Sequence, residues 1–322
     1  MDSVFATEYP DFEVLLVDNA STDGSAEFAT TKYGARSNFR VIQNERNFGY
    51  TQGNNIGIRH ATGGYIALLN SDTRVERNWL TELVNAIRPY DVGAVQSKLL
   101  SMKTPDELDS AGGLIDYYGY HLERGRGEQS SMYTQMKEVF YAKGASVLLK
   151  REVLAKTGLF DPDIFMYFDE VDLCWRIRLS GYKILFVPAS IVYHASGLTA
   201  AKSQEKERLY LHIKNHVLVL LKNYNFENMV RAAKVSVLFE TRNMALFLAR
   251  RKPLVCASIL KALLWNLRHL KRTWKKRQTV QKLVRRVPDK EIKKQMLEPY
   301  PPFPLYLVFS RSRYLRKTQV KT

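Results

Sequence analysis

Four short apolar runs, each ending in polar residues, constrain the fold of this chain more than any other sequence feature. They are FEVLLVDN (12–19), FRVIQNE (39–45), YIALLNSD (65–72) and VGAVQSKLL (92–100). Helix-length segments separate the first three runs: one opens at Ser21, a plausible N-cap, and the other (51–61) leads up to a Gly-Gly pair. This alternation predicts an α/β fold with a mostly parallel sheet flanked by helices.

The polar residues that follow these runs indicate a ligand site. In open α/β sheets, ligands bind beyond the carboxyl ends of the parallel strands. Three polar groups lie at such ends here: Asp18 with Asn19, residues 44–47, and Asn70 to Asp72. The sequence therefore places a binding site at this edge of the predicted sheet.

The chain changes character after His194. Before it, the sequence predicts strands at 139–151, 183–188 and 191–194; after it, residues 206–224 have the pattern of a helix. From residue 231 onward there are 24 Lys and Arg against four Asp and Glu, whereas residues 1–230 hold 25 against 28. We expect an α/β domain over residues 1–200 and a basic, largely helical region over residues 201–322.

This basic block favours an anionic partner, either nucleic acid or an acidic membrane surface. The longest apolar stretch, residues 253–267, has 15 residues and includes Lys261, whereas a bilayer span needs about 20 residues. Around 263–287, apolar residues recur near helical spacing with Lys and Arg between them, which is typical of a helix lying on a membrane. A solvated basic helix or a dimer contact is the alternative. Since no nucleic-acid reader motif is present, we expect an anionic membrane surface and no nucleic acid.

Cysteine use and the N-terminal residues indicate the compartment. The two cysteines, Cys174 and Cys256, are far apart in apolar surroundings, which is typical of a reduced cytosolic protein. Met1 is followed by acidic and polar residues and not by the basic-then-apolar run of a signal peptide. These features predict a cytoplasmic protein that is peripheral at the inner face of the membrane.

Three strand ends carry side chains suited to a nucleotide and a metal. Asp72 can offer an oxygen to a divalent cation, and Asn70 can bond to a sugar or phosphate, although a turn or helix cap also explains this Asn-x-Asp. Asp18 can accept hydrogen bonds from a ribose or a base. An Asx turn, or the acidic residue of a dinucleotide-binding fold, would also place an Asp there. His194 ends the last predicted strand, where it can ligate a metal or serve a structural role.

The stretch MYFDEVDLCWRIRLS places three carboxylates among aromatic residues. Asp172 has Arg176 four residues later, as in an ordinary helical ion pair. Asp169 and Glu170 stand in the first helical turn, where the helix dipole favours negative charge. Capping explains one carboxylate but not a pair, and nearby aromatic surface raises the pKa of a carboxyl toward that of a useful base.

Several motifs in the same order resemble those of the family 2 glycosyltransferases, most of all the rhamnosyltransferase-type branch. They are YPDFEVLLVDNASTDGS, NFGYTQGNNIGI, GGYIALLNSDT, GASVLLKREV and GLFDPDIFMYFDEVDLCWRIRLSGYKILFVPASIVYH, over residues 8 to about 200. The resemblance implies the GT-A fold and an inverting transfer of rhamnose or a similar sugar from a dTDP- or UDP-linked donor. It also implies a glycan or lipid-linked acceptor and assistance by Mg²⁺ or Mn²⁺.

The resemblance assigns donor-side roles residue by residue. Asp18 matches an aspartate that contacts the base and ribose. Asn70 and Asp72 match the metal and donor motif, with Asp72 as the metal-side carboxylate. His194 is similar to a histidine that completes the metal site. Further donor-binding candidates in the same motifs are Asn19, Asn47 and Asn54.

The resemblance also assigns the reacting side. Asp169 and Glu170 match an acidic pair whose second member is the general base, which favours Glu170. The acidic order is reversed here, so Asp169 is the alternate catalytic candidate. Asp172 resembles an acceptor-side or structural carboxylate, and Trp175 is expected beside it on the acceptor side.

The N-terminal residues depart from the family pattern. Members begin with a strand and a helix that lead into the YPDFEV segment, whereas this chain starts inside that helix. Loss of a central strand would expose the edges of its neighbours. The two explanations are a misplaced start and a catalytically inactive copy that acts as a membrane-attached scaffold.

Overall fold

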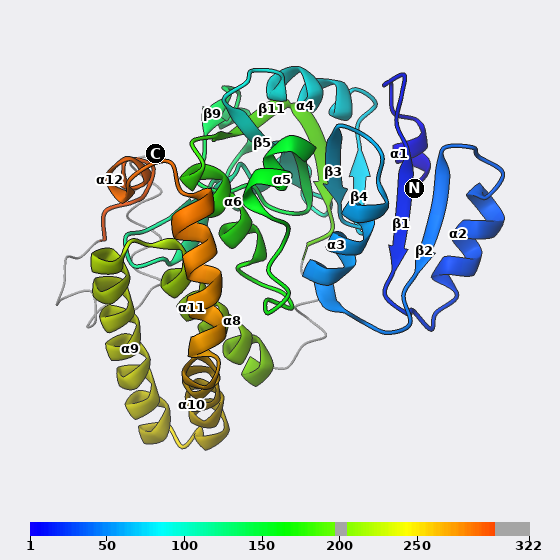
Figure 1. Cartoon of the computed structure of the whole chain (residues 1–322). Helices are drawn as coiled ribbons and strands as arrows, with labels where there is room; N and C mark the ends of the chain where they lie inside the picture. The colour runs from blue at the N-terminus through cyan, green and yellow to red at the C-terminus, as the bar shows by residue number, and fades with distance from the viewer. Residues whose placement is uncertain (197–204, 300–322) are drawn as a thin grey trace.

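The computed structural model describes residues 1–196 and 205–299 and shows an α/β core with a group of helices at its C-terminal side (Figure 1). The strands are β1 (Val14–Asp18), β2 (Phe39–Gln43), β3 (Tyr65–Leu69), β4 (Thr73–Val75), β5 (Val92–Ser101), β6 (Leu108–Ser110), β7 (Gly113–Ile115), β8 (His121–Glu123), β9 (Lys137–Glu138), β10 (Ser146–Lys150) and β11 (Lys183–His194). The helices are α1 (Asp2–Phe5), α2 (Ser25–Tyr33), α3 (Gly49–His60), α4 (Trp79–Ile87), α5 (Arg151–Thr157), α6 (Asp169–Leu179), α8 (Glu205–Asn223), α9 (Phe226–Ala249), α10 (Pro253–Arg268), α11 (Leu270–Thr279) and α12 (Asp289–Lys293).

The main sheet has the strand order β3-β10-β5-β11-β4, with β6 paired to β5 and β9 paired to β11. β5 and β11 are parallel, and so are β1 and β2, as the sequence predicts. β10 runs antiparallel to both β3 and β5, so the main sheet is mixed. The reversal follows from the connection: short strands, and not a crossover helix, fill the chain between β5 and β10.

The two strands expected at 183–188 and 191–194 are one strand, β11. Its register against β5 shifts between Val187 and Ile191. Pro188 lies inside this irregular stretch. Proline has no backbone N–H to donate, and at a bulge the sheet does not need that hydrogen bond. The bulge lets one long strand carry His194 to the carboxyl end of the sheet.

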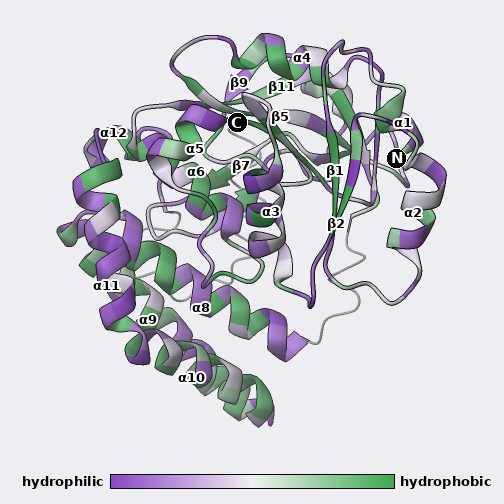
Figure 2. Ribbon diagram, turned by 45° about the vertical axis from the view of Figure 1, so that its right-hand side comes forward, coloured by the Kyte–Doolittle hydropathy of each residue, from purple (hydrophilic) through white to green (hydrophobic). Residues whose placement is uncertain are grey.

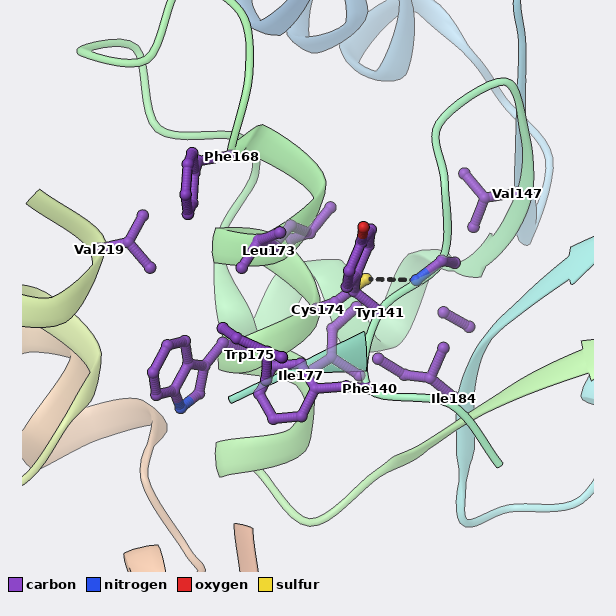
Figure 3. Close-up of a cluster of buried hydrophobic side chains, with 14 of the residues drawn as sticks. Phe140, Tyr141, Val147, Phe168, Leu173, Cys174, Trp175, Ile177, Ile184 and Val219 are labelled. Atoms are coloured by element: carbon purple, nitrogen blue, oxygen red, sulfur yellow. Dashed lines mark hydrogen bonds between the residues drawn. The ribbon is translucent and has the colours of Figure 1, made fainter. Parts of the chain in front are cut away.

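Helices cover both faces of the main sheet. The buried side chains of α4 pack on one face with Val95 and Leu148, while those of α5 and α6 pack on the other with Leu149 and Phe186. Figure 3 shows the second face, where Trp175 of α6 stands edge-on to Phe140, with ring centroids 5.5 Å apart. In the same cluster the Ala142 N–H donates to Cys174 Sγ at 3.4 Å. Both Cys174 and Cys256 are buried and free.

β1 and β2 form a separate two-stranded sheet. Among the described residues no strand pairs with the second edge of β1 or of β3, so both edges are open. Val14 to Val17 are only half-buried although their run is apolar throughout, and Tyr65 of β3 is 39% exposed. The Glu13 carboxylate accepts hydrogen bonds from the Thr62 side chain at 2.7 Å and the Gly63 N–H at 3.3 Å, and so bridges the two sheets at one end.

The C-terminal helices pack onto the α/β core through α8. α8 lies against α6, while α9, α10 and α11 lie against α8. The α9–α10 hairpin projects away from the main sheet in both views (Figures 1 and 2). The predicted boundary at residues 200/201 lies outside the described residues. No helix in the described parts of the chain is both long enough and apolar enough to cross a bilayer.

Candidate functional site

The end of β1 places Asp18 beside the start of the loop to α2. Its buried carboxylate accepts a hydrogen bond from the Ser21 N–H at 3.1 Å, and its carbonyl accepts one from the Asn44 N–H at 2.9 Å. The bond spans three residues, one more than in the Asx turn that the sequence left open as an alternative. The carboxylate has further lone pairs, so the turn leaves acceptor capacity at this position.

Three predicted donor-side amides hold the loops together. Asn19 donates to the Gly49 carbonyl at 3.1 Å and accepts from the Asn44 side chain at 2.9 Å. Asn47 accepts from the Gly49 N–H at 2.8 Å, and Asn54 donates to the Tyr50 carbonyl at 2.8 Å within α3. The structure thus brings Asn19 and Asn47 together at the start of α3, and it places Asn54 one turn further along.

Asn70, Asp72 and His194 converge at the end of the main sheet. The Asp72 Oδ1 atom lies 3.3 Å from His194 Nε2, and the Asn70 amide nitrogen lies 3.5 Å from the same atom. β4 and β11 pair antiparallel here, with Thr73 opposite His194, which explains how residues so far apart in sequence meet. His194 is buried, while Asn70 and Asp72 are half-exposed, so the group opens to one side.

Asp169 and Glu170 begin α6 after two residues with left-handed backbone. Tyr167 and Phe168 have φ of 66° and 64°, a conformation that costs about 1–3 kcal/mol for such bulky residues and must be held by surrounding contacts. Asp169 is buried at 3% exposure, whereas Glu170 is half-buried. The Gly144 N–H donates to Glu170 Oε1 at 3.0 Å, which fixes the orientation of this carboxylate.

Both members of this pair have raised pKa values. Burial, together with repulsion by Glu170, raises the pKa of Asp169 well above its usual value. Burial also raises the pKa of Glu170, and the hydrogen bond from Gly144 opposes that rise. Asp169 is the more deeply buried of the two, and its pKa is the more strongly raised.

A short loop joins the two halves of the site. Gly144 bonds to Glu170, the neighbouring Lys143 donates to Asp109 at 2.9 Å, and Asp109 Oδ2 lies 2.8 Å from His194 Nδ1. The next residue, Ala145, accepts a hydrogen bond from the Asn70 N–H at 3.1 Å. Residues 143–145 therefore connect the acidic pair of α6 to the Asp72–His194 group.

A family model matches the N-terminal part of this chain. The family model described as glycosyl transferase family 2 matches residues 1–158, which run from α1 to α5. The match covers just under half of the 322-residue chain. Asp18, Asn70 and Asp72 lie inside this family 2 domain, whereas the α6 pair and His194 lie beyond the matched residues.

Curated relatives match part of this chain. The O-antigen biosynthesis protein RfbC of Myxococcus xanthus is 29% identical over 204 residues, which cover 61% of this chain and 16% of that protein. The N-acetylglucosaminyl-diphospho-decaprenol L-rhamnosyltransferase of Mycobacterium tuberculosis is 26% identical over 212 residues, 59% of this chain and 68% of that protein. An uncharacterized protein of Sinorhizobium fredii is 27% identical over 63% of this chain and 23% of its own length. The chain thus matches less than a quarter of the length of two of these relatives.

Solved structures show the same fold. GalNAc-T7 with UDP, GalNAc and Mn²⁺ superposes with a TM-score of 0.57 at 18% identity, covering 79% of this chain and 51% of that chain. The mannosyltransferase PcManGT from Pyrobaculum calidifontis, in complex with GDP-Man and Mn²⁺, gives 0.51 at 17% identity, covering 100% of this chain and 82% of that chain. The likeness confirms the predicted GT-A fold around the family 2 domain.

The structure buries the two predicted acceptor-side residues. Asp172 and Trp175 are both 0% exposed and lie in the core beside the family 2 domain. Arg176 Nη2 and Lys222 Nζ lie 2.9 and 2.8 Å from the Asp172 carboxylate, and Asn223 donates to it at 3.0 Å. Its ion pair with Arg176 is the helical pair that the spacing predicts, so Asp172 is the structural carboxylate and touches no solvent-facing surface.

Sequence reasoning missed Asp109 and Lys143. Asp109 lies in β6 within a run of short strands, 85 residues from His194, and no motif marks it. Although burial raises the pKa of a carboxyl, the contacts with His194 and Lys143 hold the pKa of Asp109 well below its usual value. Asp109 thus stays ionised and fixes the imidazole so that Nε2 faces Asp72.

We expect the stability of the metal-free chain to fall with rising pH because of His194. Burial lowers the pKa of the imidazole, but the hydrogen bonds to Asp109 and Asp72 outweigh it and raise the pKa from 6.5 to about 9. This stabilisation is complete below about pH 6.5 and is lost as the pH rises through about 9. Urea unfolding in EDTA across this pH range should show the free energy of unfolding falling with rising pH. Asp109→Asn should make this fall less steep. If the pH dependence of stability is unchanged in Asp109→Asn, it does not arise from the contact between His194 and Asp109.

Proposed function

We propose that this chain is an inverting glycosyltransferase. It moves a hexose, rhamnose or a similar sugar, from a nucleotide-diphosphate donor to a hydroxyl of a glycan or lipid-linked acceptor. The observation that carries the proposal is the pairing of two carboxyls of raised pKa with an Asp–His group, joined through residues 143–145. A base for the acceptor and a phosphate-binding end for the donor are the two parts that such a transfer needs.

Glu170 is proposed as the general base. Its carboxylate is the more accessible and the more acidic member of the pair, and Gly144 holds one oxygen in place. An acceptor hydroxyl attacks an anomeric carbon efficiently only when a positioned group takes its proton. Because a single base acts from one face, the attack displaces the nucleotide directly and inverts the anomeric centre. Asp169, buried and protonated, supports the charge on Glu170.

Asp72, His194 and Asn70 fit a divalent metal shared with the donor diphosphate. The donor set combines a carboxylate, an imidazole nitrogen and an amide oxygen, of which the carboxylate suits Mg²⁺ and Mn²⁺. Within residues 1–196 and 205–299 no three His, Cys, Asp or Glu side chains form a complete cage, so phosphate oxygens would supply further ligands. A bound metal neutralises the charge that develops on the leaving diphosphate. His194 must first release its proton to become a ligand.

The nucleotide is proposed to lie between the two sheets. Asp18 and Asn19 at the end of β1 face the base and ribose, with Asn47 at the start of α3 beside them. Their hydrogen bonds to loop backbone position these polar groups without using all of their acceptor capacity. Asn54 lies one helical turn further from this edge and completes the predicted donor side. A dTDP- or UDP-linked sugar is the proposed donor class.

Calorimetric titration of UDP and dTDP into the purified chain, with and without Mn²⁺, tests the donor site. We expect binding that strengthens at least tenfold with Mn²⁺, and we expect Asp72→Asn to lose most of that gain because one metal-side carboxylate is removed. Asp106→Asn, an exposed carboxylate in the loop between β5 and β6, is the matched control. A folded sample that binds neither nucleotide would favour the inactive scaffold over the enzyme.

The acceptor is proposed to be presented at the cytoplasmic face of a membrane. The basic C-terminal region provides the electrostatic attraction for anionic lipid, and the proposed protein is peripheral to that membrane.

A further inference from the structure

α10 is apolar on two faces. One face is buried against α8 and α9, and there Asn266 donates to the Lys214 carbonyl of α8 at 3.1 Å. The opposite face carries Leu260, Leu264 and Leu267, spaced i, i+4 and i+7, which are 47%, 39% and 66% exposed. A soluble helix needs one apolar stripe to pack, so the second stripe is unexplained by the fold.

The neighbouring helices extend this apolar surface. Of the nineteen large hydrophobic side chains exposed in the described residues, twelve lie between Phe226 and Leu283. At the tip of the α9–α10 hairpin, Leu248 and Leu254 are 57% and 69% exposed. Figure 2 shows hydrophobic residues along α9 and α10, which project from the core. Val237, Leu238 and Leu246 are also exposed on α9, and Leu270 and Trp274 are exposed on α11.

The tip of the hairpin and α10 have charge of one sign. Residues 241–288 contain 14 Lys and Arg and no Asp or Glu. Three of these cations, Arg250, Arg251 and Lys252, are exposed in the turn between Leu248 and Leu254. Apolar side chains are thus bordered by cations along an acid-free segment of the chain, which is the composition of interfacial membrane helices.

We infer that the α9–α10 hairpin and the exposed stripe of α10 dock on an anionic lipid bilayer. Leu248, Leu254 and the Leu260–Leu264–Leu267 stripe enter the headgroup–acyl boundary, while the cations contact lipid phosphates. A second copy of the chain fits less well, because like charges would face each other without acidic partners. A nucleic acid would contact the cations and leave the leucines in water.

α8 connects this docking surface to the candidate active site. Lys261 of α10 lies over the Tyr210 ring of α8, with its Nζ 4.9 Å from the centroid. One helical half-turn later, His212 stacks on Tyr167, with ring centroids 4.4 Å apart, and Tyr167 precedes Asp169 by two residues. A single helix therefore separates the bilayer surface from the acidic pair. The link from the bilayer to the acidic pair rests on the proposed function. It identifies the acceptor as one carried by a membrane lipid.

Vesicle co-sedimentation with the full chain tests the docking. We expect binding to vesicles of equal phosphatidylcholine and phosphatidylglycerol that weakens at high salt, and much weaker binding to phosphatidylcholine alone. Arg250→Gln/Arg251→Gln/Lys252→Gln should weaken binding to the anionic vesicles by about a hundredfold, since each such cation contributes about a factor of five. Leu260→Gln/Leu264→Gln/Leu267→Gln should weaken it at least tenfold.

A matched control shows whether the loss of vesicle binding is specific to this surface or follows from removing any three exposed apolar side chains. Phe28→Gln/Tyr90→Gln/Met132→Gln also removes three exposed apolar side chains, at 63%, 88% and 71% exposure, and should bind vesicles as the unaltered chain does. Thermal melting checks that each variant folds. Equal loss in the control, equal binding to both vesicle types, or a preference for DNA over vesicles would overturn the proposal. So would a concentration-dependent dimer that the stripe variant abolishes. Nucleotide binding is measured separately, so failure of docking and failure of the enzymatic proposal remain distinct.

Discussion

Glu170→Gln is expected to lower the rate of sugar transfer by about 10²–10⁴-fold, the usual contribution of a positioned general base. Glutamine keeps the size of the side chain and can accept the Gly144 hydrogen bond, but it cannot take a proton from the acceptor. Donor affinity should therefore be unchanged, as measured by calorimetry with the nucleotide. Steady-state kinetics with saturating donor would report the loss in kcat.

Two further variants make this prediction specific. Asp169→Asn should retain far more activity than Glu170→Gln, because burial raises the pKa of Asp169 and so favours its neutral carboxyl, which an amide replaces closely. Glu123→Gln removes a nearby carboxylate from β8 and should affect the rate only weakly. If Asp169→Asn abolishes transfer while Glu170→Gln does not, the roles of the pair are exchanged.

Lys222→Met is expected to lower the free energy of unfolding by about 3–5 kcal/mol, the usual effect of removing one partner of a buried ion pair. The Lys222 ammonium lies 2.6 Å from Asp161 and 2.8 Å from Asp172, and all three side chains are almost fully buried. Without it, two carboxylates lose a shared cation in a region that water does not reach. Urea denaturation followed by circular dichroism measures the change.

Arg231→Met is the matched control for this result. Arg231 forms an exposed ion pair with Glu227 at 3.2 Å, and such pairs contribute less than about 1 kcal/mol. A loss in Lys222→Met no larger than that in Arg231→Met would show that α8 is not anchored to the core through this cation. Lys276 of α11 also pairs with Asp161, so the same network ties a second C-terminal helix to the loop before α6.

The elements that sequence predicts best are those with contiguous local patterns. β1, β2, β3 and β5 fall within the predicted runs to a few residues, because a short apolar run ending in polar residues is specified by neighbours along the chain. The start of α6 is another such case, since its acidic first turn is a local signal. The charged helical region after residue 205 follows for the same reason.

Features that depend on distant contacts were beyond the sequence. Asp109 has no motif of its own, and only the pairing of β6 with β5 brings it to His194. Asp172 and Trp175 share a segment with the acidic pair, so proximity in sequence suggested the same environment. Every residue of α6 from Val171 to Leu179 is buried, so both side chains lie in the core instead. The antiparallel direction of β10 likewise arises from a long irregular connection.

The division of the strands into two sheets has a consequence for donor recognition. Asp18 and Asn19 belong to the sheet of β1 and β2, whereas Asn70, Asp72 and His194 belong to the main sheet. A nucleotide sugar held by both groups would link the two sheets. Its base end would bind the β1–β2 sheet and its phosphate end the main sheet, and so the ligand would fix the distance between two sheets that share no strand pairing. Part of the binding free energy would then be spent on reducing their relative motion. Donor affinity would consequently report the rigidity of the whole fold as well as the contacts in the site.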